Sequence, residues 1–119
     1  MEAIFVGTLD GIFKIRCSSG YGWQMVGQQL AGSEVTLLVT HPSQRSVIYA
    51  GIRGGGLYRS RDAGKSWQRL GEKILSDKIR ALALDPNDAQ TIYVGTEPPS
   101  LWQSRDGGDR GGRTFILML

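Results

Sequence analysis

The chain has one cysteine, Cys17, and one histidine, His41, and this scarcity excludes several kinds of site. A lone cysteine forms no intrachain disulfide and offers no CxxC pair for a metal. No run of about 18 apolar residues occurs, so no hydrophobic membrane-spanning segment is expected. The segment Met1–Thr8 contains neither a basic stretch nor an apolar signal core, which predicts a cytoplasmic location.

The chain also carries little excess charge of either sign. The net charge is +3, and the 14 basic residues are dispersed along the 119-residue chain rather than gathered in a run. Four arginines, Arg53, Arg59, Arg61 and Arg69, lie close together in sequence, and the expectation for them is a solvated surface. No aromatic–basic module for RNA or DNA is visible, so nucleic acid is not an expected partner.

What the chain does contain is an internal repeat. The segment Ile92–Asp106 repeats Ile48–Asp62 at an offset of 44 residues, and Val35–Pro42 aligns with Ile79–Pro86 at the same offset. Stepping back once more leads from Ile48 to Ile4. A fixed period of this length with strand-like content is typical of repeat folds, in which no unit buries its apolar face alone.

The content of each copy is that of short strands joined by turns. Ile48–Gly51 and its repeat are β-branched and aromatic, and Pro98 and Pro99 mark a loop because they cannot donate ladder hydrogen bonds. In Ile79–Leu84 only Arg80 is polar, which predicts a strand covered on both faces. Four antiparallel strands per copy indicate an all-β fold of β-propeller blades.

The period leaves room for roughly two and three-quarter blades, whereas closed propellers have about 4–8. The predicted units are a partial first blade with strands 2–4 in residues 1–27, a second blade in 28–72 and a third in 73–119. The ring is therefore incomplete, and open edges invite pairing. Three interpretations follow: a truncated product of a larger propeller protein, completion of the ring by further copies or by a partner chain, or a small open stack of sheets.

The C-terminal tail has two interpretations. The third copy has Gly111 where the second has Trp67. Either a four-residue insertion lets Phe115 replace the tryptophan, with residues 116–119 as the outer strand, or the tail has diverged and is an accidental apolar end. An exposed strand of such residues would favour aggregation, so the second interpretation is slightly favoured.

One motif carries a family resemblance. The second copy contains S-x-D-x-G-x-S-W, made of Ser60, Asp62, Gly64, Ser66 and Trp67, and the third has an atypical version with Ser104, Asp106 and Gly108. This pattern resembles the Asp-box, or BNR repeat, of sialidase-like, sortilin-like, xyloglucanase-like and photosystem II assembly factor-like propellers. The resemblance covers nearly the whole chain. It implies a structural turn between the third and fourth strands of a blade, with the aspartate bonded to turn amides and the tryptophan packed in the sheet.

The first copy departs from this pattern. Ser18 stands in the aspartate position, beside Gly20 and Trp23, and Arg16 replaces the first serine. A hydroxyl accepts from turn amides more weakly than a carboxylate does. The first box is therefore degenerate, while Trp23 is still expected to pack.

The sequence indicates no catalytic, cofactor-binding or metal-binding residue. The Arg-Ile-Pro signature of sialidases with this repeat is absent. Glycosidases need two carboxyls at a set separation, and nothing in the sequence places two of the turn acids, such as Glu34 and Asp85, in that way. The leading hypothesis is a non-catalytic segment with a binding or scaffold role, whose candidate binding turns contain Asp10, Arg53 and Glu97. Its alternatives are a fragment of a sialidase-like or xyloglucanase-like glycoside hydrolase and an assembly-factor analogue, and carbohydrate is a ligand that no motif supports.

Overall fold

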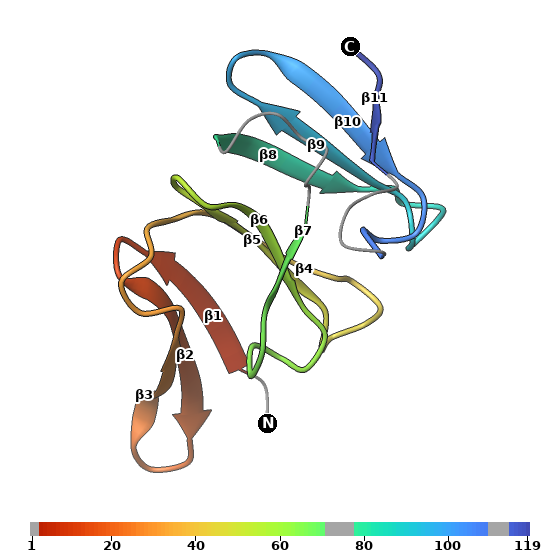
Figure 1. Cartoon of the computed structure of the whole chain (residues 1–119). Coiled ribbons are helices and arrows are strands. Elements are labelled where there is room, and N and C mark those ends of the chain that lie inside the picture. The colour runs from red at the N-terminus through yellow and green to blue at the C-terminus, as the bar shows by residue number, and fades with distance from the viewer. Residues whose placement is uncertain (1–2, 71–77, 110–114) are drawn as a thin grey trace.

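A computed structural model of the chain describes residues 3–70, 78–109 and 115–119. These residues form three antiparallel sheets in which neighbouring strands follow one another along the chain (Figure 1). Blade 1 contains β1 (Ala3–Thr8), β2 (Gly11–Ser18) and β3 (Gly22–Gln29). Blade 2 contains β4 (Val35–Thr40), β5 (Ile48–Ile52), β6 (Gly56–Ser60) and β7 (Gln68–Leu70). Blade 3 contains β8 (Ile79–Leu84), β9 (Ile92–Thr96), β10 (Ser100–Ser104) and β11 (Ile116–Leu117).

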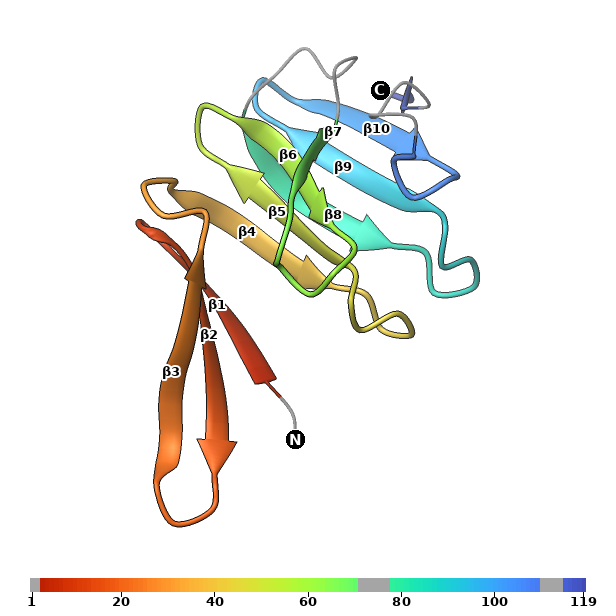
Figure 2. The ribbon, with the colours of Figure 1, turned by 60° about the horizontal axis from the view of Figure 1, so that its bottom comes forward.

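The predicted fold class, all-β with partial propeller blades, is confirmed. Each sheet holds one copy of the repeat, and β3 ends two residues beyond the boundary predicted at residue 27. Blade 2 lies between the other two, since β4 contacts β1 on one side and β8 on the other (Figure 2). In the part of the chain that is described, no helix has the length and apolar character needed to cross a membrane.

The hydrophobic core consists of layers between the blades. The layer between blades 2 and 3 buries Tyr49, Leu57 and Leu70 against Ile92, Val94, Trp102 and Phe115. The layer between blades 1 and 2 is built on Ile12, Ala50 and Ile52, with Phe5, Leu38, Tyr58 and Trp67 packed against it. Because each layer takes residues from two copies, no sheet could keep its apolar face from water by itself.

Strand β8 differs from the prediction. Leu82 and Leu84 pack against blade 2, but Arg80, Ala81 and Ala83 are exposed. The strand was expected to be covered on both faces, and it is covered on one, since none of the described residues packs over the second face. Alternation on a half-covered strand places successive side chains on opposite faces.

The C-terminal tail forms the outer strand of blade 3. Trp102 pairs with Leu117 and Gln103 with Ile116, and Phe115 is buried in the core. This arrangement agrees with the insertion interpretation rather than with the accidental end that the sequence slightly favoured. Residues 116–119, which follow Phe115, are all exposed. Residues 112–114, which would complete the motif ahead of Phe115 after the insertion, lie outside the described residues.

Blade 1 is out of register with the sequence alignment by one residue. Its first turn places two residues between the paired Thr8 and Gly11, whereas the equivalent turn of blade 2 places three between Ile52 and Gly56. A shift of one residue moves a side chain to the other face of a sheet. Phe13, the alignment equivalent of Leu57, accordingly lies on the outward face of blade 1, paired with Val6. Trp23 was expected to pack as Trp67 does, and it lies on the corresponding face, the one that in blade 2 packs on the preceding blade. It is nevertheless 55% exposed, because none of the described residues covers that face of blade 1.

Candidate functional site

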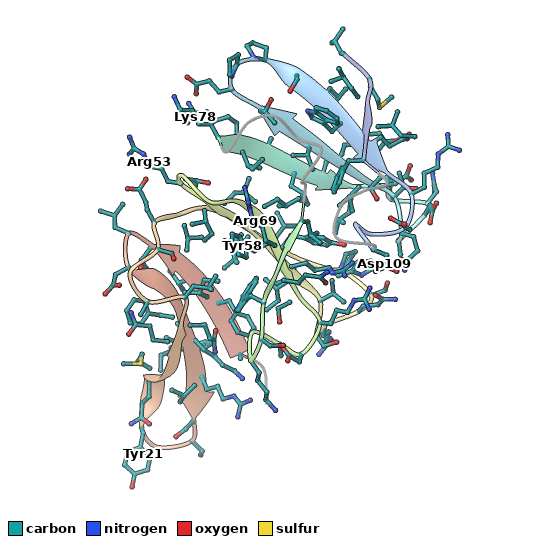
Figure 3. The ribbon with its side chains drawn as sticks, viewed as in Figure 1. Tyr21, Arg53, Tyr58, Arg69, Lys78 and Asp109 are labelled. Carbon is teal, nitrogen blue, oxygen red and sulfur yellow. The ribbon has the colours of Figure 1, made fainter. Side chains whose placement is uncertain are left out.

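Two of the candidate binding turns meet on one face of the structure. The turn after β5 is fixed by a hydrogen bond from the Arg53 amide to the Glu34 carbonyl, at 2.9 Å. The turn after β9 repeats this bond 44 residues later, from the Glu97 amide to the Lys78 carbonyl at 3.0 Å. The repeat thus presents equivalent turns from successive blades side by side, and Arg53 and Lys78 reach toward the same region (Figure 3).

These turns enclose a crevice of about 320 Å³ between blades 2 and 3, which we call the turn-face crevice. Its lining residues are Glu34, Thr36, Arg53, Lys78, Ile79, Arg80 and Glu97. The Thr36 hydroxyl donates to the Ile79 carbonyl across the floor, at 3.3 Å. That bond joins the inner strands of the two blades, so the floor is a fixed part of the fold.

Charges of both signs surround the crevice. Arg53 pairs with Glu34 at 3.3 Å, and Arg80 pairs with Glu97 at 3.1 Å. Equivalent positions carry opposite charges in the two blades: Glu34 corresponds to Lys78, and Arg53 to Glu97. Exposed ion pairs of this kind add little stability, so their side chains can exchange partners at small cost. The crevice can therefore offer both donors and acceptors to a bound molecule.

Asp10, the third candidate residue, does not line the crevice. It lies in the turn between β1 and β2, where its carboxylate accepts a hydrogen bond from the Gly32 amide at 2.7 Å. Its carbonyl accepts a second hydrogen bond, from the Gln28 side chain at 2.8 Å. The first bond attaches this turn to the segment that leads into blade 2, and the second attaches it to β3. The structure thus brings Arg53 and Glu97 together and gives Asp10 local contacts.

The segment from Ser60 to Trp67, the Ser60 turn, is closed by side-chain hydrogen bonds. The Ser60 hydroxyl donates to the Asp62 carboxylate and accepts from the Gly64 amide, each at 2.8 Å. The other end is held because Ser66 donates to the same carboxylate through its amide at 2.8 Å and its hydroxyl at 2.5 Å. The Trp67 indole then donates to the Gly64 carbonyl at 3.1 Å. All five motif residues are therefore engaged within the turn.

Asp62 should make stability depend on pH. Hydrogen bonds from the Ser66 hydroxyl and amide and from Ser60 lower the pKa of Asp62 from 3.8 to about 2. A lowered pKa means that this stabilisation is present above the unfolded value and is lost as pH falls through the folded value. We expect the free energy of unfolding of the wild type to exceed that of Asp62→Asn above pH 4, with the difference closing as pH falls toward 2. Urea unfolding at a series of pH values measures this.

Ser66→Ala is the matched control for the Asp62 experiment. It removes the largest cause of the lowered pKa and leaves the carboxylate in place, so the acid-dependent loss should be smaller than in the wild type and complete at a higher pH. A difference between the wild type and Asp62→Asn that stays constant from pH 4 to 2 would contradict the assignment.

The Ser104 turn, from Ser104 to Asp109, repeats the first half of this geometry. The Ser104 hydroxyl donates to Asp106 at 2.8 Å and accepts from the Gly108 amide at 3.1 Å. In the first copy, the equivalent segment is instead a hairpin turn, in which the Tyr21 amide donates to the Ser18 carbonyl and Gly20 has a positive φ. The hairpin extends away from the other blades, and Tyr21 marks its tip (Figure 3).

Comparison of the two serine turns predicts a stabilising substitution. Ala63 has φ 60°, and the equivalent Gly107 has φ 68°. An L-residue in this region is strained by about 1–2 kcal/mol, and glycine loses about 0.5–1 kcal/mol more backbone entropy on folding. Ala63→Gly should therefore raise the free energy of unfolding by about 0.5 kcal/mol, as measured by urea unfolding. Gly107→Ala, the reciprocal control, should lower it, and a destabilised Ala63→Gly would refute this account.

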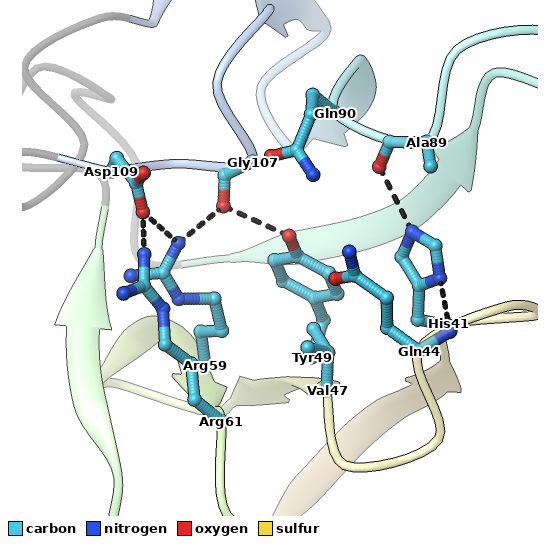
Figure 4. Close-up of a pocket in the computed structure, with 10 residues that line it drawn as sticks. All are labelled: His41, Gln44, Val47, Tyr49, Arg59, Arg61, Ala89, Gln90, Gly107 and Asp109. Atoms are coloured by element: carbon cyan, nitrogen blue, oxygen red, sulfur yellow. Dashed lines mark hydrogen bonds and ion pairs between the residues drawn. The ribbon is translucent and has the colours of Figure 1, made fainter.

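A second cavity, of about 300 Å³, lies between the same blades beside the Ser104 turn (Figure 4). The Gly107 carbonyl accepts hydrogen bonds from the Tyr49 hydroxyl and from Arg59 Nη1, both at 2.8 Å. Arg59 Nη1 also contacts the Asp109 carboxylate at 2.8 Å, and Arg61 pairs with the same carboxylate. Burial raises the pKa of Tyr49, so its hydroxyl remains a donor at neutral pH.

The sequence misjudged one residue beside this cavity, Arg59, and indicated for a second, His41, only a place in the turn before Pro42. The expectation of a solvated surface is wrong for Arg59, whose side chain is 4% exposed, because its strand carries it into the layer between blades 2 and 3. His41 is also buried, and its Nε2 contacts the Ala89 carbonyl of blade 3 at 2.9 Å, while its Nδ1 accepts from the Ser43 and Gln44 amides. Both side chains join two blades. A clue for Arg59 was its alternation with the apolar Leu57.

The turn-face crevice and the serine turns belong to a fold with a known counterpart. The solved structure of an ancestral GH74 enzyme is similar to this chain, with a TM-score of 0.72 and 18% sequence identity. The match covers 98% of this chain and 16% of that enzyme. No protein-family model and no curated protein matches the sequence. At this level of identity the likeness shows the fold, a set of propeller-like blades that spans a small part of the enzyme's length.

Among the described residues, no group of three or more His, Cys, Asp or Glu side chains could hold a metal ion.

Proposed function

We propose that this chain is a non-catalytic segment of an Asp-box propeller and that it binds a partner in the turn-face crevice. The observation that carries the proposal is the crevice itself. It is built from equivalent turns of two blades, it has a fixed floor at Thr36, and its walls carry charges of both signs. Loops on a rigid scaffold are the usual place for recognition.

The assignment of the serine turns to the Asp-box is part of this proposal. Their support is the shared network in which Ser60 and Ser104 each bond an aspartate two residues on and an amide four residues on. The carboxylate of Asp62 is occupied by the groups of its own turn, which favours a structural role over a catalytic one. These turns then fix the blades, and recognition takes place elsewhere.

The chemistry of the crevice favours a polypeptide segment that carries both acidic and basic side chains. Arg53, Lys78 and Arg80 can meet carboxylates, and Glu34 and Glu97 can meet ammonium groups. Complementary charges of this kind provide specificity more than raw affinity. The two glutamates would repel a phosphate backbone, which disfavours nucleic acid at this place.

The test compares binding of the wild type with that of Arg80→Glu on an array of short peptides in which acidic and basic residues alternate. Binding to at least one set of peptides that weakens about tenfold or more in the variant would support the crevice as the site, because one pairing becomes a repulsion. Arg105→Glu, a reversal at an exposed residue away from the crevice, is the control. Equal binding by all three proteins would refute the proposal.

The alternative is a fragment of a glycoside hydrolase, and the likeness to the ancestral GH74 enzyme favours it as the second candidate. Hydrolysis needs an acid and a second carboxylate on opposite sides of the bond that is cleaved. In the crevice, Glu34 and Glu97 each pair with an arginine. We expect no release of reducing sugar from xyloglucan by this chain. Release that disappears in Glu97→Gln would replace the binding proposal with the alternative.

A further inference from the structure

The outward face of blade 1 exposes apolar side chains whose equivalents in blade 3 are buried. Ile4 and Val6 of β1 are 45% and 42% exposed, and Val6 pairs with Phe13 across β2. The equivalent residues of blade 3, reached through the same pairing of β9 with β10, are Ile92, Val94 and Trp102. These three are buried against blade 2. The first blade therefore shows to solvent the surface with which a blade packs on its predecessor.

The exposed surface of blade 1 extends beyond this triad. Pairing of β2 with β3 places Met25 beside Ile15, and Ile15 is itself paired with Ile4, so these three side chains share the outward face. Trp23 continues the face, and both Met25 and Trp23 are exposed. A contiguous apolar face of this kind is uncommon on a surface that remains in water.

The opposite end of the structure carries the receiving half of the same interface. In blade 2, Leu37, Tyr49 and Leu57 receive the triad of blade 3. Their equivalents in blade 3 are Ala81, Tyr93 and Leu101, which lie on its outward face, where Ala81 and Ala83 are exposed. The small side chains at Ala81, Ala83 and Gly95 leave room beside Tyr93 for the larger side chains of a neighbouring blade.

We propose that a second copy of this chain docks its blade 1 on the outward face of blade 3, in the way that blade 3 docks on blade 2. The interface would continue one that the molecule already contains twice, between blades 1 and 2 and between blades 2 and 3. It joins two different faces, so it is heterologous: each copy keeps one face free, and the assembly either closes into a ring or continues to grow. The inference is independent of what the turn-face crevice binds.

Two variants test the proposal, one at each face. Val6→Asp places a charge on the outward face of blade 1, and Ala83→Arg places one on the outward face of blade 3. Both residues are exposed, so the fold should persist, and far-UV circular dichroism checks that it does. By sedimentation analysis, the wild type should gain mass as its concentration rises, and each variant alone should remain a monomer. Leu9→Asp and Asn87→Arg, at exposed turn positions, are the controls and should associate as the wild type does.

A mixture of the two variants gives the decisive result. Val6→Asp retains an intact blade 3 face, and Ala83→Arg retains an intact blade 1 face, so one good interface can form between them. Mixed in equal amounts, they should form a dimer with one copy of each and nothing larger. Any of three results would overturn the proposal: a wild type that stays monomeric at every concentration, a mixture that stays monomeric, or a single variant that still dimerises, which would mean an interface between identical faces.

Discussion

Trp102→Ala should lower the free energy of unfolding by about 3–5 kcal/mol, the range for truncating a large buried aromatic residue. Trp102 is 8% exposed in the layer between blades 2 and 3, and its neighbours across the sheet are Val94 and Leu117. Alanine leaves a cavity that the paired strands on both sides prevent from closing. It also removes the hydrogen bond from the indole to the Ser100 hydroxyl, at 3.0 Å.

Trp23→Ala is the matched control, since it removes the same side chain from the outward face of blade 1. Trp23 is 55% exposed, so its loss should cost less than about 1 kcal/mol when both variants are unfolded in urea at low protein concentration. The sequence alignment instead predicts a substantial loss of stability for Trp23→Ala, because it matches Trp23 with Trp67, which is packed in the second copy. Equal losses for Trp102→Ala and Trp23→Ala would mean that Trp23 is buried and that the outward face of blade 1 is covered.

The sequence was sufficient to predict the fold because the repeat places the same apolar pattern and the same turns in each copy. It could not predict which face of blade 1 each residue occupies. A turn that is one residue shorter, between Thr8 and Gly11, changes the register without disturbing the alignment of the flanking segments. The number of covered faces of β8 could not be predicted either, because an apolar strand has the same sequence pattern whether one face or both faces are packed.

The turn-face crevice was only partly predictable. Arg53 and Glu97 occupy equivalent turns, so their presence on one face of the structure follows from the repeat. Lys78 and Arg80 enter the crevice because blade 3 packs beside blade 2, and that contact depends on the angle between sheets rather than on any local pattern. The reversal of charge between Glu34 and Lys78 is visible in the alignment and would have been a usable signal.

Arg59→Ala is expected to cost about 3 kcal/mol, because it removes a buried charge-assisted network that joins blades 2 and 3. Arg59 donates to the Gly107 carbonyl at 2.8 Å, to Asp109 at 2.8 Å and to the Gln68 side chain at 3.2 Å. Its loss leaves the Gln68 oxygen without this donor and opens space beside Tyr49. Asp109 is 43% exposed and can turn to water, so the estimate lies at the lower end for a broken buried pair.

Arg61→Ala is the control for charge alone. Arg61 pairs with the same Asp109 carboxylate, but its side chain is 61% exposed, so its removal should cost less than about 1 kcal/mol. Tyr49→Phe tests the shared acceptor, since the Tyr49 hydroxyl also donates to the Gly107 carbonyl at 2.8 Å. It should cost about 1–1.5 kcal/mol, the usual net value of one hydrogen bond.

The double variant Arg59→Ala with Tyr49→Phe separates a shared role from two independent ones. Each single variant leaves the Gly107 carbonyl with one donor, whereas the double variant leaves it with neither, so the combined loss should exceed the sum of the single losses. Urea unfolding of the four proteins gives the coupling. Strict additivity would show that Arg59 and Tyr49 do not share the Gly107 carbonyl. A cost for Arg59→Ala no larger than that for Arg61→Ala would place Arg59 in solvent, where its sequence neighbours Arg61 and Arg69 first suggested it lay.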